Sequence, residues 1–222
     1  MSSQINFEEE EKRGSFYDMA VELHKQKFEI SAYILILATW NFAGFRYAVR
    51  DFDINNFRKK MKSLEPCFDK LKDEKFKTIK FDDYATEIKE IYDTLIKDVK
   101  GIGYTGASKV MHLKNREIFV MWDGFIKKQH KEEYYKKLPL VKKGYFKKYF
   151  GEIKKYDNSS DDYLEFLKAM QKIFKDVDFQ DNEKTFAKAI DEFNYMQITD
   201  LIRKMEKDER EKAKEAKKSK KK

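Results

Sequence analysis

Residues 101–126 read GIGYTGASKVMHLKNREIFVMWDGFI, and they combine the glycines and polar side chains of this chain that could do chemistry. Gly101 and Gly103 predict a tight turn, because glycine adopts the positive φ angles that such turns use. A helix should start near Tyr104, so that free backbone N–H groups at its first turn can bind an anion such as phosphate. The small residue Gly106 lets another backbone or a ligand approach that turn.

Asp123 ends this segment, directly after the apolar run FVMW at 119–122. We expect another helix to begin here, since an aspartate can accept hydrogen bonds from the free N–H groups of a first turn. The helix dipole would favour its negative charge, and a fixed carboxylate can stabilise a positive charge that develops nearby in a reaction. The alternative is a helix cap with no role in catalysis, as most aspartates at helix starts are.

The glycine turn is neither a P-loop, because no GK[ST] follows it, nor a dinucleotide-binding fingerprint, because no strand precedes it. The order of helix, GIG, helix and apolar run ending in Asp resembles the helix-hairpin-helix DNA glycosylase superfamily. That group includes endonuclease III and the adenine-excising and 8-oxoguanine-excising branches. ATWNFAGFR at 38–46, the hairpin at 101–113 and FVMWD at 119–123 look most like an 8-oxoguanine-glycosylase-like branch.

The resemblance implies roles for particular residues. Asp123 would stabilise the charge that develops on the sugar as a damaged base departs, or orient the nucleophile. Branches that also nick the strand carry a Schiff-base lysine two residues after the second glycine. Thr105 occupies that position here, 18 residues before Asp123. The resemblance therefore implies excision by water, without strand nicking, unless Lys109, one helical turn further on, replaces the missing lysine. Lys109 could equally be a solvated or phosphate-contacting lysine.

Two further groups of residues are expected to contact DNA. A flipped base stacks between aromatic and apolar groups, and the segment at 38–46 offers Trp40, Asn41 and Phe45 for such a pocket, although packing in the core is an equal alternative for Trp40. The backbone of duplex DNA would be bound by the hairpin and the first basic residues after Asp123, namely Gly101, Gly103, Tyr104, Thr105, Gly106, Lys127 and Lys128.

The net charge of +8 is concentrated in two segments. Residues 127–148 contain 9 Lys and 2 Glu, and residues 203–222 contain 11 Lys and Arg with 5 Asp and Glu. In this first segment and directly after it, lysine pairs alternate with Tyr134, Tyr135, Tyr145 and Tyr149, a pattern that suits a surface following the DNA backbone. A plain solvated face is the alternative interpretation.

The fold expected from 222 residues with only 8 Gly and 2 Pro is all-α. Apolar residues recur at helical spacing in Ile30–Val49, in Phe81–Val99 with Asp82 or Asp83 as cap, and from Ser160 or Asp161 onward. Pro66 is expected to break an earlier helix. The resemblance implies two helical lobes that flank a DNA-binding cleft. Residues 1–202 would form this unit, with residues 50–125 as one lobe and the terminal helices as the other, and residues 203–222 form a solvated helix or a disordered tail.

The sequence shows no sign of export or of membrane insertion. The N-terminus lacks the basic and apolar regions of a signal peptide, and the apolar run Ala32–Trp40 is too short to span a bilayer. Cys67, the single cysteine, indicates a reducing compartment rather than a nucleophile. We therefore expect an intracellular monomer, in the cytoplasm, nucleoid or nucleus, which binds double-stranded DNA without a metal or cofactor. Two alternatives stay open, a helix-hairpin-helix protein that binds DNA without chemistry and a helical protein-interaction module.

Overall fold

The fold was analysed in a computed structural model, which describes residues 14–40, 45–46, 49–139, 155–181 and 184–219. Helices make up more than half of the chain, and no strand occurs within these ranges. The expected all-α class is therefore confirmed. In chain order the helices are α2 (Gly14–Lys25), α3 (Glu29–Trp40), α5 (Ile54–Leu71), α6 (Ala85–Lys97), α7 (Gly103–Lys114), α8 (Glu132–Lys137), α11 (Ser160–Phe174), α12 (Phe186–Asn194), the π-helix η1 (Tyr195–Thr199) and α13 (Asp200–Ser219).

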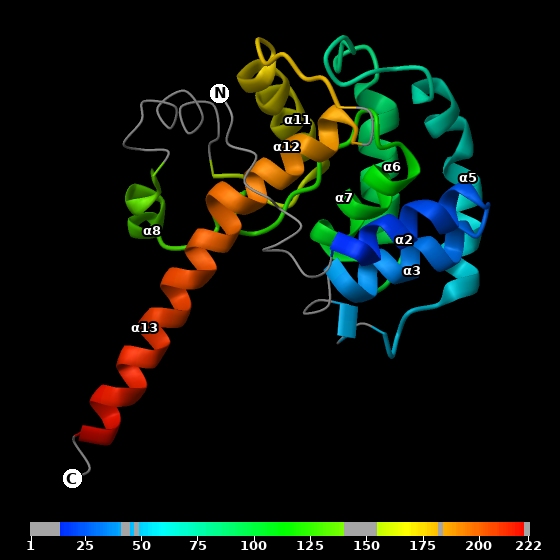
Figure 1. The fold of residues 1–222 in the computed structure, drawn as a ribbon. Helices are drawn as coiled ribbons and strands as arrows, with labels where there is room; N and C mark the ends of the chain where they lie inside the picture. The colour runs from blue at the N-terminus through cyan, green and yellow to red at the C-terminus, as the bar shows by residue number, and fades with distance from the viewer. Residues whose placement is uncertain (1–13, 41–44, 47–48, 140–154, 182–183, 220–222) are drawn as a thin grey trace.

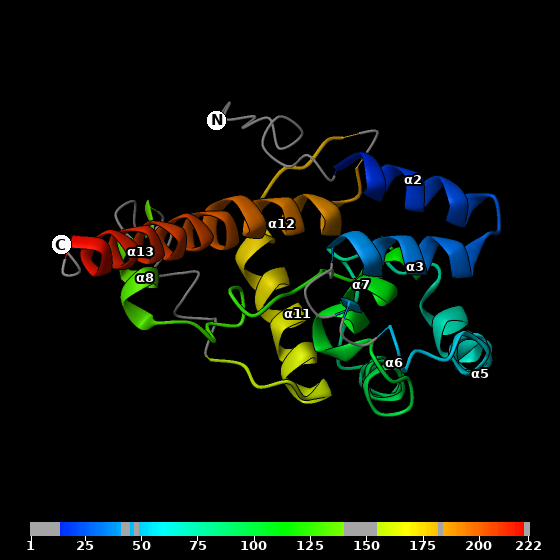
Figure 2. The same ribbon diagram turned by 90° about the horizontal axis from the view of Figure 1, so that it is seen from below.

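Helix α7 lies at the centre of this arrangement. It packs against α6 on one side and against the pair α2 and α3 on another, while α11 packs against α6 (Figures 1 and 2). Every residue from Gly106 to Leu113 is buried, including the polar Ser108, Lys109 and His112. The helix that follows the glycine turn is thus enclosed by protein along most of its length, and only its first residues reach the surface.

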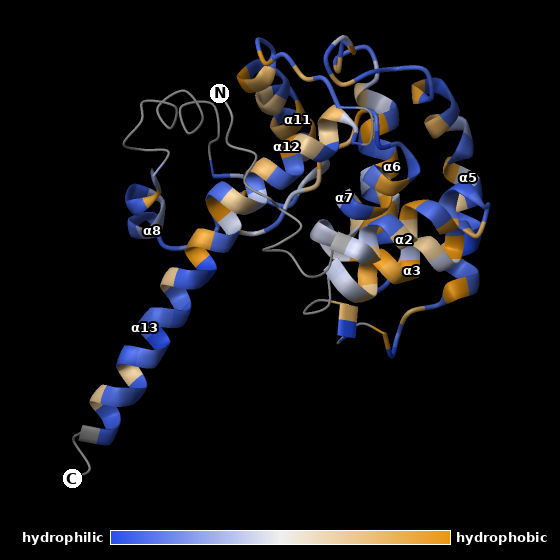
Figure 3. Cartoon of the chain, viewed as in Figure 1, coloured by the Kyte–Doolittle hydropathy of each residue, from blue (hydrophilic) through white to orange (hydrophobic). Residues whose placement is uncertain are grey.

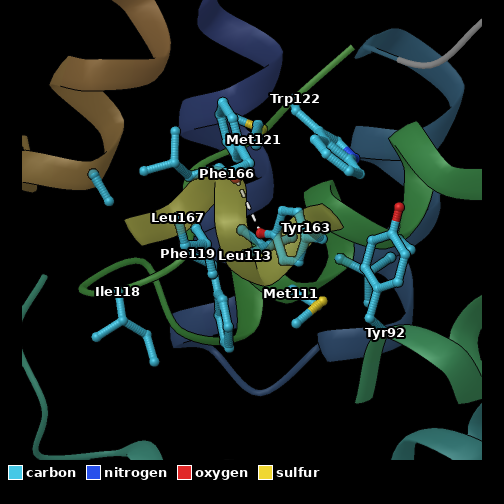
Figure 4. Packing of buried hydrophobic residues seen from close by; sticks show 14 of the residues in the cluster. Tyr92, Met111, Leu113, Ile118, Phe119, Met121, Trp122, Tyr163, Phe166 and Leu167 are labelled. Atoms are coloured by element: carbon cyan, nitrogen blue, oxygen red, sulfur yellow. Dashed lines mark hydrogen bonds between the residues drawn. The ribbon is translucent and has the colours of Figure 1, made fainter. Parts of the chain in front are cut away.

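Large aromatic side chains fill the core between α6, α7 and α11 (Figure 4). The rings of Tyr92 and Tyr163 stack with centroids 4.8 Å apart, and Trp122 meets the Tyr163 ring edge-on at 5.0 Å. Trp122 is 1 % exposed and so lies fully in the core. Such aromatic pairs each add about 0.5–1.5 kcal/mol beyond the burial of their area.

Pro66 does not break the helix that contains it, and this expectation is wrong. Helix α5 runs through Pro66 to Leu71, and Asp53 caps its start by accepting hydrogen bonds from the N–H groups of Asn55 and Asn56. Proline removes one hydrogen bond to the carbonyl four residues earlier, which belongs to Lys62. Both Pro66 and Lys62 are exposed, so water can satisfy that carbonyl while the apolar face stays packed.

Several helix boundaries also differ from the sequence pattern. Helix α6 begins at Ala85 without a side-chain cap, and Asp82 instead forms an ion pair with Lys168 of α11. The helix expected over Ile30–Val49 is described as α3 only to Trp40, and Val49 lies in an exposed turn.

Residues 203–219 are helical. They form most of α13, a hydrophilic rod that projects from the body of the protein (Figure 3). The solvated-helix alternative for the tail therefore holds as far as Ser219.

Candidate functional site

The glycine turn has the conformation that the sequence predicts. Gly101 and Gly103 have φ angles of 93° and 60°, and α7 starts at Gly103. The turn is fixed from α5, because Asn56 donates to the Asp98 carbonyl at 2.7 Å and Lys60 donates to the Asp98 carboxylate at 2.6 Å. No side chain caps α7, so the N–H groups of its first turn are available to a ligand or to water.

A groove of about 890 Å³ lies against this turn. One wall is residues 101–105 with the end of α6, and the other is residues 158–161, where the chain enters α11. Tyr104 is 43 % exposed at the edge of the hairpin, and Thr105 is half-buried. The structure thus brings Gly101, Gly103, Tyr104 and Thr105 to one accessible surface, whereas Gly106 is buried behind them.

Asp123 does not begin a helix, which corrects the expectation. Residues 124–128 form a single turn, and Asp123 Oδ1 accepts from the N–H groups of Phe125 at 2.9 Å and Ile126 at 3.0 Å. Its other oxygen, Oδ2, accepts a hydrogen bond from the hydroxyl of Thr199 at 3.0 Å. Both oxygens of this half-buried carboxylate are therefore held in place.

Residues 118–122, which lead to Asp123, are buried and belong to no helix or strand. Side chains provide the hydrogen bonds that a neighbouring strand would otherwise supply. Tyr163 donates to the Val120 carbonyl at 3.0 Å, and His112 Nδ1 donates to the Phe119 carbonyl at 2.6 Å. Because the partners come from α7 and α11, the position of Asp123 is coupled to the hairpin.

Lys127 is buried, not exposed toward DNA as we had expected. It is 2 % exposed, and its ammonium donates to Asn158 Oδ1 at 2.5 Å. The ammonium lies 4.8 Å from the centre of the Trp122 ring and 5.2 Å from that of Tyr104. Burial lowers the pKa of Lys127 to about 8, and the charge of Asp123 acts in the opposite direction. In this conformation Lys127 supports the groove from behind.

Two of the aromatic residues expected among the surface lysines are also inside the protein, whereas Tyr145 and Tyr149 lie outside the described residues. Tyr134 and Tyr135 are each 2 % exposed, and their hydroxyls donate to Glu209 and to the Phe125 carbonyl. Lys128 is half-buried with a φ angle of 54°. Lys136 and Lys137 are exposed on α8, while the rest of the basic stretch, 140–148, lies outside the described residues.

Lys109 and Trp40, two of the proposed site residues, do meet. The Lys109 ammonium donates to the Trp40 carbonyl, and it is 8 % exposed. The ring of half-buried Trp40 is covered by the ammonium of Lys188, 4.3 Å from its centre. Phe45 lies elsewhere, in the core against Phe52, and Asn41 lies outside the described residues.

Lys188 belongs to a buried group of charges beside these residues. It forms ion pairs with Asp191 at 3.2 Å and Glu192 at 3.4 Å, and it also covers the Tyr17 ring at 4.4 Å. Burial raises the pKa of Asp191 to about 6, although Lys188 and Lys109 oppose that shift. Sequence reasoning missed this group, because its members fall within an ordinary amphipathic pattern on α12.

The described residues contain no cluster of three or more His, Cys, Asp or Glu side chains able to hold a metal ion. Among them there is also no helix both long and apolar enough to cross a membrane. Comparisons of the chain with protein-family models, curated proteins and solved structures found no match.

Proposed function

We propose that this protein is a DNA N-glycosylase that removes a damaged base, with Asp123 as its catalytic carboxylate. The main support is the fixation of Asp123, whose two oxygens are both hydrogen-bonded and whose position is coupled to the hairpin through the buried segment 118–122. A carboxylate held rigidly before the reaction needs no reorganisation as positive charge develops beside it.

The reaction proceeds by substitution at C1′ of the damaged nucleotide. The bond from C1′ to the base nitrogen breaks, and its electron pair leaves with the base. A water oxygen bonds to C1′, and the proton it releases is taken up by the departing base. The sugar carries positive charge in between, so the Asp123 carboxylate stabilises the transition state more than the neutral ground state, which accelerates the reaction. The resemblance of the sequence favours an oxidised purine of the 8-oxoguanine kind as the base.

The hairpin supplies binding to the DNA backbone in this proposal. The open N–H groups of α7 and the turn at Gly101 and Gly103 suit a phosphate of duplex DNA. Residues 50–125 and the terminal helices act as the two lobes of a cleft, and Trp40 contributes to the base pocket. The protein works as an intracellular monomer on double-stranded DNA.

Excision occurs without strand nicking. Thr105 stands where a Schiff-base lysine would be needed, and Lys109 is buried with its ammonium bonded to the Trp40 carbonyl. Neither residue offers a free amine at the mouth of the hairpin.

The experiment that tests this function is a panel of duplexes, each with one lesion, scored for abasic-site formation. The parent protein should release at least one damaged base, and Asp123→Asn should abolish release while duplex binding persists, since the amide keeps the shape but not the charge. Asp73→Asn, at an exposed turn, is the matched control and should be fully active. Release by Asp123→Asn at the parent's rate would refute the catalytic role.

A second candidate is a helix-hairpin-helix protein that binds DNA without chemistry. It is favoured by one observation, namely that the three hydrogen bonds that Asp123 accepts from described residues are all internal, as in a simple turn cap. This candidate replaces the first if the panel yields no excised base while binding stays salt-sensitive and dependent on Gly103.

A further inference from the structure

Among the described residues, the side chain that donates a hydrogen bond to Asp123 is the hydroxyl of Thr199. We propose that Thr199 is a positioning residue, which holds the Asp123 carboxylate in the orientation that stabilises positive charge. This inference rests on the proposed function and assigns a second residue to the same site.

Thr199 is buried, and its hydroxyl is bonded to Asp123. It is 0 % exposed, and its Oγ1 lies 3.0 Å from Asp123 Oδ2. An ionised carboxylate can only accept, so the hydroxyl must be the donor. The two backbone N–H groups hold Oδ1, and the Thr199 hydroxyl adds a bond on Oδ2 that further restricts rotation of the planar carboxylate about its Cβ–Cγ bond.

The helix around Thr199 is irregular at this point. Tyr195–Thr199 forms a π-helix, and the N–H of Asp200 donates to the Tyr195 carbonyl five residues earlier. A π-turn inserts an extra residue into a helix, which changes the face on which the following residues lie, and such turns occur frequently at functional sites. Here the irregular turn joins α12 to α13 and directs Thr199 toward Asp123.

Thr39 provides an internal comparison. Its hydroxyl donates to the Leu35 carbonyl four residues earlier, which is the usual local bond of a threonine within a helix. The Thr199 hydroxyl instead donates to Asp123, across 76 positions of the sequence. A threonine that only stabilises its own helix would bond to a carbonyl of that helix, as Thr39 does, and not to a distant carboxylate.

The test compares Thr199→Val, which removes the hydroxyl at nearly constant shape, with Thr199→Ser, which keeps it. Excision is measured under single-turnover conditions on the best lesion of the panel. Affinity is measured for two duplexes, one with a cationic pyrrolidine in place of the sugar and one with a neutral tetrahydrofuran. We expect Thr199→Val to slow excision by about 10- to 100-fold, as expected for a displaced catalytic group.

The ratio of the two affinities separates positioning from folding. In Thr199→Val the preference for the cationic duplex should fall, while affinity for the neutral duplex stays near the parent value. The Tm should fall modestly, because a buried hydrogen bond to a carboxylate is lost. Thr199→Ser should restore both rate and preference, and Thr78→Val, at an exposed turn, should change neither. The proposal is overturned if Thr199→Val keeps the parent's rate and preference, if both affinities fall together, or if Thr199→Ser fails to rescue.

The two proposals can fail separately. If the parent excises no lesion, the glycosylase function is wrong. The affinities for the cationic and the neutral duplex then decide whether Thr199 positions Asp123. A preference for the cationic duplex that depends on both Asp123 and Thr199 then supports the positioning role. An equal affinity of the parent for the two duplexes rejects it.

Discussion

The side chain of Ser108, on α7, is hydrogen-bonded to the main chain of Trp122, the residue before Asp123. The N–H of Trp122 donates to Ser108 Oγ at 3.3 Å, and the Ser108 hydroxyl donates to the Thr105 carbonyl at 2.9 Å. Ser108 is 0 % exposed, so these bonds are shielded from water. The first turn of the hairpin helix and the chain leading to Asp123 are thus joined through one hydroxyl.

Replacing Ser108 by alanine should destabilise the fold. The N–H of Trp122 would be left without this partner in a buried position, which costs about 1–3 kcal/mol. Urea denaturation of Ser108→Ala measures the loss. Ser63→Ala is the matched control, because that exposed hydroxyl bonds only to the Lys60 carbonyl. A loss below about 0.5 kcal/mol, as is usual for surface substitutions, would contradict the structural importance of the bond.

Replacing Gly103 should discriminate between backbone strain and crowding. Its φ angle is 60°, but no atom lies within 4 Å of the position that a Cβ would occupy. Gly103→Val should therefore weaken duplex binding through strain alone, whereas Gly103→Asn should be tolerated, since asparagine adopts this conformation several times more often than most residues. Fluorescence anisotropy at several salt concentrations measures both variants. Equal affinity of the valine variant and the parent would remove the turn from the DNA interface.

Borohydride trapping tests the absence of a Schiff base. The parent should give no covalent complex and no nicked strand, because Thr105 has no amine and the Lys109 ammonium is engaged with the Trp40 carbonyl. Should a complex form, Lys109→Gln and Lys127→Gln identify the amine responsible. Trapping lost in Lys109→Gln would show that Lys109 acts as a displaced nucleophile, and that excision here is not by water alone.

His112 should make stability depend on pH below neutrality. Burial lowers the pKa of His112 to about 3, and its ring bonds to Tyr17 and to the Phe119 carbonyl suit the neutral form. The unfolded chain binds a proton near pH 6.5, so the stabilisation is complete above that pH and is lost as pH falls toward 3. Between pH 6.5 and 4.5 the parent should lose about 2–3 kcal/mol relative to His112→Gln.

Urea titrations of the two proteins at matched pH values give this difference directly. Asp191 and other groups that titrate in the same range contribute equally to both, and their effects cancel in the difference. A difference that does not change across this range would contradict the assignment of His112 as a buried neutral histidine.

The distal part of α13 should add non-specific affinity for DNA. Residues 212–222 contain 7 Lys and 1 Glu, whereas Glu206 and Glu209 anchor the near part of the helix to His130 and Lys131. A chain ending at Glu211 keeps those anchors and loses the lysines. The slope of log affinity against log salt should decrease by about 2 or more, because each phosphate contact contributes about 0.9. An unchanged slope would show that the lysines only solvate the helix.

The sequence alone determined the features that depend on near neighbours. The positive φ angles at Gly101 and Gly103 follow from sterics within one residue, and the apolar spacing in residues 81–99 and 160–174 follows from the period of a helix. These local rules were sufficient for the all-α class and for the helix, turn and helix around residue 101.

Only the tertiary structure decided which polar residues are enclosed and what they touch. Lys127 has the sequence context of a surface lysine, yet Asn158 and the aromatic residues Trp122 and Tyr104 surround its ammonium. Thr199 reaches Asp123 because the chain returns after 76 positions with a π-turn, and no local pattern encodes that meeting. Burial of a charge and the pairing of distant groups are properties of packed elements, so the spacing of residues along one segment cannot specify them.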